Sequence, residues 1–128
     1  MFAVLDTNVL VSAFWSRDGK PARIISLVQN SLITPCFDSR IMEEYRGVLQ
    51  RKKFGFEKWE INHFLAQIKS DGLSVVPVPL QLSLIDETDR KFYETAKHCN
   101  AWLITGNIRH YPRDPLVVSP AIFLSKIL

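Results

Sequence analysis

The chain has 128 residues, of which 47% are hydrophobic and 23% charged, and its formal net charge is +3. This length and composition predict a single globular domain over residues 1–128 that buries a core without disulfide support. No apolar run is long enough to cross a bilayer, and the opening run stops at Asp6, too soon for a signal-peptide core. The expected location is therefore the cytoplasm, and the mild positive charge is compatible with a polyanionic partner.

Strand and helix patterns alternate along the whole chain. Short apolar runs bounded by turn-forming residues predict buried parallel strands at Phe2–Leu5, Leu32–Phe37, Ser74–Val76, Ala101–Thr105 and Leu116–Val118. Helical spacing of apolar residues predicts helices at Val9–Trp15, from Lys20 and Pro21 onward, Arg40–Arg51, Glu57–Lys69, Thr88–Cys99 and Pro120–Leu128. This alternation predicts an α/β fold in which helices cover both sides of a parallel sheet of four to five strands. Pro35 interrupts the second strand and favours a place near the sheet edge.

Acidic residues stand at the expected carboxyl edge of this sheet, where ligands bind in open α/β folds. Asp6 directly follows the first strand, although an aspartate there can equally be a helix cap. Because a helix turns by about 100° per residue, Glu44 falls at the border of the apolar face of its helix. By the same geometry Asp89 falls inside the buried face of its helix, whereas Asp86 is explained as a first-turn acid. Asn107 follows the fourth strand and offers an amide rather than a charge.

Asp6, Glu44 and Asp89 are therefore expected to converge at one end of the sheet. Taken singly, each has an ordinary explanation as a cap, a rim residue or a first-turn acid. Brought together, the carboxylates would repel and raise one another's pKa values, and a divalent cation removes that penalty. A set of oxygen ligands suits Mg²⁺ or Mn²⁺. A metal site explains the three acids together better than three unrelated caps do.

Cysteines, histidines, tryptophans and basic residues give weaker signals. Cys36 and Cys99 stand among apolar residues and are predicted to be buried thiols, and the histidines lack the spacing of zinc ligands. Trp15 and Trp59 are candidates for an interface if they are exposed, although core packing is the simpler expectation. Basic residues gather in small groups, each of which is most simply a solvated surface: Arg51, Lys52 and Lys53, and then Arg109 with His110.

Four stretches resemble the PIN domain family, and in particular the toxin-like branch of small prokaryotic PIN proteins. They are VLDTNVLVSAF, SRIMEEYRGVLQRKKF, DETDRKFYETAKHCNAWLITGNIRHYP and VVSPAIFLSKIL, which cover almost the whole chain in the expected order. The resemblance implies a three-layer α/β/α sandwich and a ribonuclease that depends on one or two Mg²⁺ or Mn²⁺ ions. It places the family's acidic residues on Asp6, Glu44 and Asp89.

The chain departs from the family pattern at one position. The fourth family acid often follows a Thr-Gly pair, where this chain has Asn107, which puts a second metal ion in doubt. Asp86 is a candidate to supply the missing charge, and Asn107 itself offers an oxygen. Thr7, Asn8 and Thr105 match positions that usually brace the site.

The resemblance implies that metal-activated water hydrolyses RNA phosphodiesters and leaves 5′ phosphates. The candidates to grip RNA phosphates are Arg51, Lys52, Lys53, Arg109 and His110. A small antitoxin protein and a homodimer are also implied. One alternative is a PIN-like module that has lost catalysis and binds RNA or a protein. A phosphatase with Asp6 as nucleophile ranks third, because Asn8 stands where such enzymes carry a second aspartate and no glycine-rich phosphate loop is present.

Overall fold

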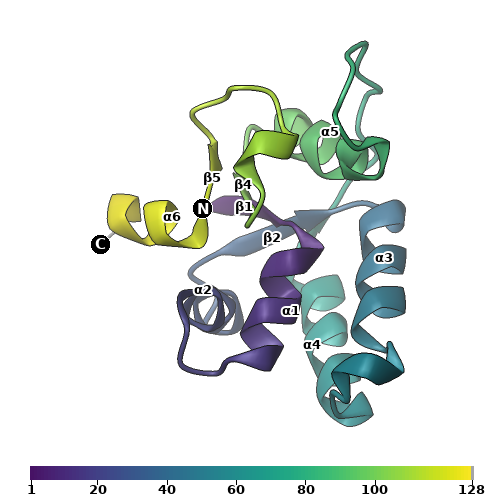
Figure 1. Ribbon diagram of the computed structural model, residues 1–128, viewed down its shortest axis with the longest axis vertical. Helices are drawn as coiled ribbons and strands as arrows, with labels where there is room; N and C mark the ends of the chain where they lie inside the picture. Colours follow the sequence, from purple (N-terminus) through teal and green to yellow (C-terminus); the bar gives the residue numbers. More distant parts are fainter. Residues whose placement is uncertain (128) are drawn as a thin grey trace.

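The computed structural model describes residues 1–127, which fold around a five-stranded sheet (Figure 1). The strands are β1 (Phe2–Leu5), β2 (Thr34–Phe37), β3 (Leu73–Ser74), β4 (Trp102–Ile104) and β5 (Val117–Val118). Their order across the sheet is β3-β2-β1-β4-β5, and every neighbouring pair is parallel. The predicted α/β fold with a parallel sheet is confirmed, and the first strand lies at its centre.

Helices cover both faces of this sheet. The described residues form α1 (Thr7–Trp15), α2 (Lys20–Gln29), α3 (Ser39–Leu49), α4 (Lys58–Asp71), α5 (Arg90–Cys99) and α6 (Pro120–Ile127). They also form the 3₁₀ turns η1 (Lys52–Phe54), η2 (Glu87–Asp89) and η3 (Ile108–His110). Helices α1, α2 and α4 lie on one side of the sheet and α5 on the other, which confirms the predicted sandwich (Figure 1). Leu128, the end of the predicted last helix, lies outside the described residues.

The central strand β1 fixes the position of Asp6 and of the helix that carries Glu44. Ala3, Val4 and Leu5 are fully buried, because helices cover β1 on both faces. The chain then turns directly into α1 at Asp6. The hydroxyl of Tyr45, on α3, donates a hydrogen bond to the carbonyl of Leu5. This bond ties the helix that carries Glu44 to the end of β1.

The prediction that Pro35 places the second strand near an edge is confirmed, since β2 is second from the edge strand β3, although it pairs on both sides, with β1 and with β3. The N–H of Thr34 donates to the carbonyl of Met1, so the neighbouring Pro35 lacks its N–H on the opposite side, toward β3. There β3 begins only opposite Cys36. The proline therefore removes no hydrogen bond from the sheet, which is why an inner strand accepts it.

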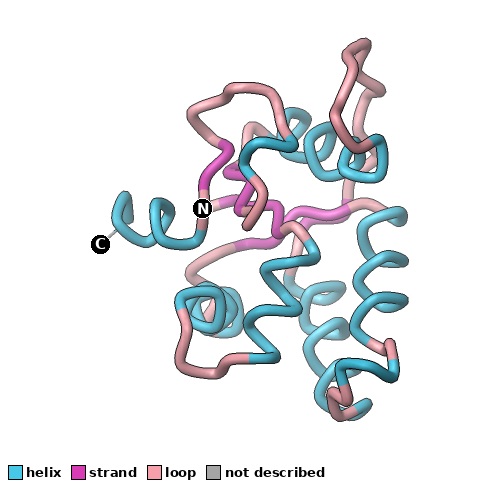
Figure 2. Tube along the Cα trace, in the orientation of Figure 1, coloured by secondary structure: helices cyan, strands magenta, loops and turns pink. Residues whose placement is uncertain are grey.

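The third strand lies earlier than predicted, at Leu73–Ser74 instead of Ser74–Val76. Val75 still donates its N–H to the carbonyl of Phe37, but Val76 is exposed and has left the sheet. Residues 75–86 form no helix or strand and lead as a long loop to η2 and α5 (Figure 2). This loop matters for the site because it delivers the chain to Asp89.

The expectation that Trp15 and Trp59 pack in the core is wrong, because both side chains are exposed. Cys36 is buried as predicted, and burial raises the pKa of its thiol to about 12, whereas Cys99 is only partly buried. No helix within residues 1–127 combines the length and the apolar character needed to cross a membrane.

Candidate active site

Asp6 is a buried carboxylate at the end of the central strand. Its Oδ2 accepts hydrogen bonds from the hydroxyls of Thr105 and Tyr111, both at 2.8 Å. It stands at the N-cap position of α1, but its side chain makes no capping hydrogen bond there. Both hydroxyls use Oδ2, so Oδ1 is taken by neither. Two hydroxyls from the far end of the chain therefore hold this side chain, and the backbone N–H of Asn8, in the first turn of α1, also lowers its pKa.

The three predicted acids influence one another electrostatically. Burial raises the pKa of Asp6, and the charge of Glu44 adds to the rise, although the hydroxyls of Thr105 and Tyr111 oppose it. Burial also raises the pKa of Asp89, and the charge of Asp6 contributes next. For Tyr111, burial and then the charges of Asp6, Asp89 and Glu44 raise the pKa. Side chains from β1, α3 and η2 thus share one region of negative potential at the carboxyl edge of the sheet.

Glu44 reaches from α3 toward this edge and is only partly exposed. Its Oε2 accepts a hydrogen bond from the hydroxyl of Thr7, the first residue of α1. Its Oε1 lies 2.8 Å from Nζ of Lys91, on α5. The same ammonium group also donates to the carbonyl of Thr88. A positive group that the sequence did not single out therefore lies against one of the candidate ligands.

Asp89 contacts His110, which the sequence predicted to bind RNA phosphates. Its Oδ2 lies 3.1 Å from Nδ1 of His110, on η3. Asp86 begins η2 and accepts hydrogen bonds from both the backbone N–H and the hydroxyl of Thr88, at 2.9 and 2.7 Å. Ligand atoms of Asp86, Asp89 and His110 all lie within 4.8 Å of one another. Asp86 thus lies close to Asp89 and His110, and it caps η2, whereas the sequence predicted an acid in the first turn of the helix.

The acids Asp6, Glu44 and Asp89 do not reach this mutual spacing of 4.8 Å in the part of the chain described. Hydroxyl groups hold Asp6, and Lys91 and Thr7 hold Glu44. The chemistry of the donors still fits Mg²⁺ or Mn²⁺, because all three are carboxylates, and burial together with the charge of a neighbouring acid raises the pKa values of Asp6 and Asp89. A doubly charged ion would offset that repulsion, and at Glu44 it would meet the ammonium of Lys91, which is already paired with Oε1.

The predicted bracing residues all make contacts at this edge. The hydroxyl of Thr105 donates to Asp6 and also accepts the N–H of Asn107, at 2.9 Å. The side-chain oxygen of Asn8 accepts the N–H of Gly106, at 3.0 Å. Together with the bond from Thr7 to Glu44, these contacts connect the end of β4 to the start of α1. The side chain of Asn107 itself is exposed, so it lies at the border of the site.

The predicted phosphate-binding residues fall into two places. Arg109 and His110 lie on η3, beside the acids, and help to line a pocket of about 350 Å³ with Asn107 and Ser119. Arg51, Lys52 and Lys53 are exposed at the far end of α3, away from the carboxyl edge (Figure 1). Only the first group is near enough to contact a phosphate at the acids.

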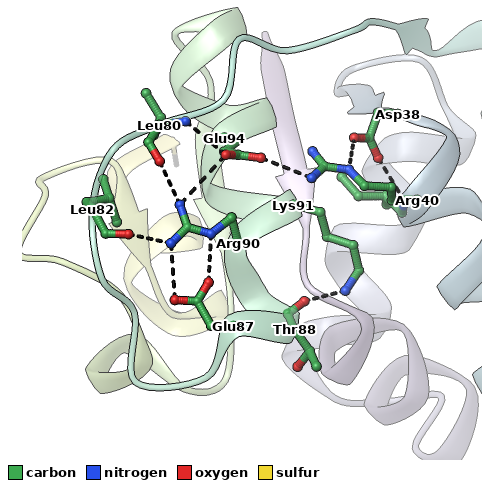
Figure 3. A network of polar contacts seen from close by, with 10 residues as sticks. Asp38, Arg40, Leu80, Leu82, Glu87, Thr88, Arg90, Lys91 and Glu94 are labelled. Atoms are coloured by element: carbon green, nitrogen blue, oxygen red, sulfur yellow. Dashed lines mark hydrogen bonds and ion pairs between the residues drawn. The ribbon is translucent and has the colours of Figure 1, made fainter.

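A network of ion pairs sets the position of α5 against α3 (Figure 3). At its centre is buried Glu94, whose carboxylate accepts from Arg40 at 3.0 Å and from the N–H of Leu80 at 2.9 Å. Arg40 also pairs with Asp38, which caps α3 through the N–H of Ile41. A second arginine extends the network to the loop before η2: Arg90 pairs with Glu87 and donates to the carbonyls of Leu80 and Leu82. The helices that carry Glu44 and Lys91 are thereby fixed relative to each other.

Tyr111 and Lys91 were not among the residues predicted from the sequence. Each acts on an acid from a distant segment, Tyr111 on Asp6 and Lys91 on Glu44. A lone tyrosine and a lysine in a helix carry no spacing pattern of their own. The one sequence signal for these positions is that they lie in the segments RHY and DRKF, which belong to the stretches that resemble the PIN family.

Comparison with known proteins agrees with this architecture. A crystal structure of VapBC2 from Rickettsia felis, bound to a DNA fragment from their promoter, contains a similar chain, with a TM-score of 0.58. The two chains are 21% identical, and the match covers 93% of this chain and 97% of that one, which shows a shared fold. No curated protein matches the chain. The model of the PIN domain family matches residues 3–109, which include β1, α3, α5 and β4. The chain belongs to the PIN domain family.

Proposed function

We propose that this protein is a metal-dependent endoribonuclease that hydrolyses RNA phosphodiesters. The observation that carries the proposal is the shared negative region formed by Asp6, Glu44 and Asp89, from three separate elements, at the carboxyl edge of a PIN fold. An isolated cluster of this kind costs free energy in a folded protein unless it binds a cation. The resemblance to the toxin-like branch of PIN ribonucleases supports RNA as the substrate.

In this proposal Asp6, Glu44 and Asp89 hold one or two Mg²⁺ or Mn²⁺ ions, with Asp86 and Asn107 as additional oxygen donors. When bound, such an ion lowers the pKa of a water molecule and polarises a phosphate. The chain's own groups orient the ligands: Thr105 and Tyr111 hold Asp6, and Thr7 holds Glu44.

The residues after β4 serve the substrate in the proposed mechanism. Asn8 fixes the backbone at Gly106, and this positions η3 with Arg109 and His110. These two side chains contact RNA phosphates, which positions the strand without reading its sequence. Attack by water on the phosphorus, with loss of the 3′ oxygen, leaves a 5′ phosphate on one product and a 3′ hydroxyl on the other.

The test is cleavage of a labelled single-stranded RNA by the purified full chain. We expect cleavage with Mn²⁺ or Mg²⁺, no cleavage with EDTA, and 5′-phosphate ends that a phosphate-dependent exonuclease degrades. Restoring Mn²⁺ after EDTA treatment should restore the activity. Equal cleavage with and without EDTA would contradict the metal mechanism.

A second candidate function rests on Asn107 and Lys91. An amide replaces one family acid, and an ammonium group lies against Glu44, so both reduce the negative charge of the site. This favours a PIN module that binds RNA or a protein without cleaving it. RNA binding that is unchanged by Mn²⁺, together with no cleavage in the presence of any divalent ion, would support this alternative.

The same family resemblance supports a small antitoxin protein as an inhibitor and a homodimer as the assembly. For the homodimer we propose the aromatic corner formed by Trp15, Phe54 and Phe56 as the contact with a second copy. Phe54 and Phe56 stack with ring centroids 5.3 Å apart, and exposed Trp15 lies edge-on to both at 6.2 and 6.1 Å. This preassembled apolar surface loses little side-chain entropy when it is covered.

Replacing Trp15 with alanine is expected to shift the protein from dimer to monomer, as measured by light scattering over a range of concentrations. Trp59→Ala is the matched control, because Trp59 is equally exposed and has no aromatic ring contact among residues 1–127. A wild-type protein that stays monomeric at high micromolar concentration would contradict the dimer. Loss of the dimer in both variants would extend the interface to Trp59 on α4 and contradict its assignment to the aromatic corner alone.

A further inference from the structure

The ammonium group of Lys91 lies inside the acidic site. The side chain leaves the first turn of α5, packs over the ring of Phe92 at 5.1 Å, and is only 13% exposed. Its Nζ is 2.8 Å from Oε1 of Glu44 and donates to the carbonyl of Thr88, one residue before Asp89. A charged group confined between α3 and η2 in this way occupies the space where these two elements would share a cation.

Lys91 differs from its neighbours Arg40 and Arg90 in the residue with which it pairs. It lines a groove of about 430 Å³ together with Arg40 and Arg90. Arg40 is bound to Asp38 and Glu94, and Arg90 to Glu87 and two backbone carbonyls (Figure 3). Releasing either arginine would break contacts that hold the helices together. Lys91 instead pairs with Glu44, so its release breaks only this pair and the bond to the carbonyl of Thr88 and leaves the contacts of the two arginines in place.

We propose that Lys91 is the internal counter-cation of the site, pairing with Glu44 in the metal-free protein and moving to an RNA phosphate when a divalent ion takes Glu44. Two cations cannot both approach the Glu44 carboxylate closely, because their mutual repulsion at such short range opposes the second. A lysine on a flexible stem can turn from a carboxylate to a phosphate without a change of backbone. The groove beside it gives the phosphate a place to lie.

This inference rests on the proposed function, and it makes two predictions of opposite sign. Removal of the ammonium should strengthen metal binding, because the metal ion no longer competes with Lys91 for Glu44. It should weaken RNA binding, but only when metal is present, because in the metal-free protein Lys91 is occupied by Glu44. A lysine with a merely structural role would lower both affinities or neither.

The first measurement is calorimetric titration of the metal-free full chain with Mn²⁺ alone. We expect Lys91→Met to bind Mn²⁺ about tenfold more tightly than the wild type, the size expected for one nearby charge. Lys91→Arg, which keeps the charge, should bind as the wild type does. The matched control is Lys97→Met on the same helix, since Lys97 pairs with Asp114 at 2.9 Å and is 46% exposed. Its Mn²⁺ affinity should not change.

The second measurement is fluorescence anisotropy of a labelled phosphorothioate RNA that resists hydrolysis, in EDTA and in Mn²⁺. We expect Lys91→Met to lose several-fold in RNA affinity in Mn²⁺ and to match the wild type in EDTA. Thermal unfolding followed by circular dichroism checks that each variant is folded, and Lys91→Gln replaces the methionine variant if that one is not.

The outcomes separate this inference from the proposed function. A wild type that binds Mn²⁺ and a folded Lys91→Met that binds it equally or more weakly would overturn the role of Lys91 and leave the nuclease proposal standing. A wild type that binds no Mn²⁺ would overturn both. Equal loss of RNA affinity in EDTA and in Mn²⁺ would make Lys91 a permanent phosphate contact and overturn the exchange.

Discussion

Asp6→Asn is expected to reduce RNA cleavage by more than about a hundredfold, the upper end of the loss seen when even an outer-shell partner of a metal ligand is removed. Asparagine keeps the size of the side chain, and its amide oxygen can accept the hydroxyls of Thr105 and Tyr111. The variant lacks the charge that attracts the divalent ion. The measurement is the initial rate of cleavage in Mn²⁺, compared with that of Asp18→Asn, an exposed aspartate in the turn after α1.

The same substitution has a predicted effect on stability. Burial raises the pKa of Asp6 above its ordinary value of 3.8. A group whose pKa is raised by folding stabilises the protein at pH values below its unfolded pKa, and this contribution is lost as the pH rises through the folded pKa. The metal-free wild type should therefore lose stability relative to Asp6→Asn as the pH rises above about 4 and through the raised pKa of Asp6. At neutral pH in EDTA the variant should melt at the same temperature as the wild type or higher.

Two results would contradict these expectations. Cleavage by Asp6→Asn at the rate of the wild type would remove Asp6 from the mechanism. A variant that melts well below the wild type at neutral pH would show that the Asp6 charge stabilises the fold, as a structural cap does. The combination of lost activity and retained stability is what distinguishes an acid of an active site from a structural residue.

Glu94→Ala is expected to destabilise the protein by about 1–3 kcal/mol, the usual cost of leaving a polar group without its hydrogen-bond partner, because half-exposed Arg40 keeps its pair with Asp38. Glu94 is 4% exposed and accepts from Arg40 and from the backbone N–H of Leu80. Without Glu94, the N–H of Leu80 and Nη1 of Arg40 lose their hydrogen-bond acceptor. Urea unfolding at neutral pH measures the change in the free energy of unfolding.

The matched control for Glu94 is Glu87→Ala, which removes the other carboxylate that Arg90 contacts. Glu87 is 61% exposed, and a surface pair of this kind contributes less than about 1 kcal/mol. Equal destabilisation by the two substitutions would show that Glu94 does not hold the network together. A large effect of Glu94→Ala alone would confirm that its burial makes it the centre of the contacts between α3, α5 and the loop before η2.

The local sequence pattern was sufficient to predict the strand and helices that carry Asp6, Glu44 and Asp89. The apolar run before Asp6 and the acids ahead of Tyr93 placed these side chains at one edge, because a parallel sheet with helical crossovers leaves few alternatives. The helical facing of Glu44 was also informative, since a side chain at the border of an apolar face is the one that can reach over a sheet edge.

Other features depend on contacts that local pattern does not contain. Val75 and Val76 look like strand residues, but β2 offers no further partner beyond Phe37, so Val76 turns into solvent. Pro35 is accepted in an inner strand because of where β3 begins. Trp15 is exposed because Phe54 and Phe56 give it a surface to pack on outside the core. The roles of Tyr111 and Lys91 arise from the pairing of segments far apart in the sequence.

The order of the strands has a consequence for how the protein is made. Strand β1 precedes the other strands along the chain, yet it pairs with β4, and Asp6 receives its hydroxyl contacts from Thr105 and Tyr111, 99 and 105 residues later. Contacts of such long sequence separation form late in folding. A chain that lacks residues 105 and 111 therefore cannot form the two hydroxyl contacts that hold Asp6.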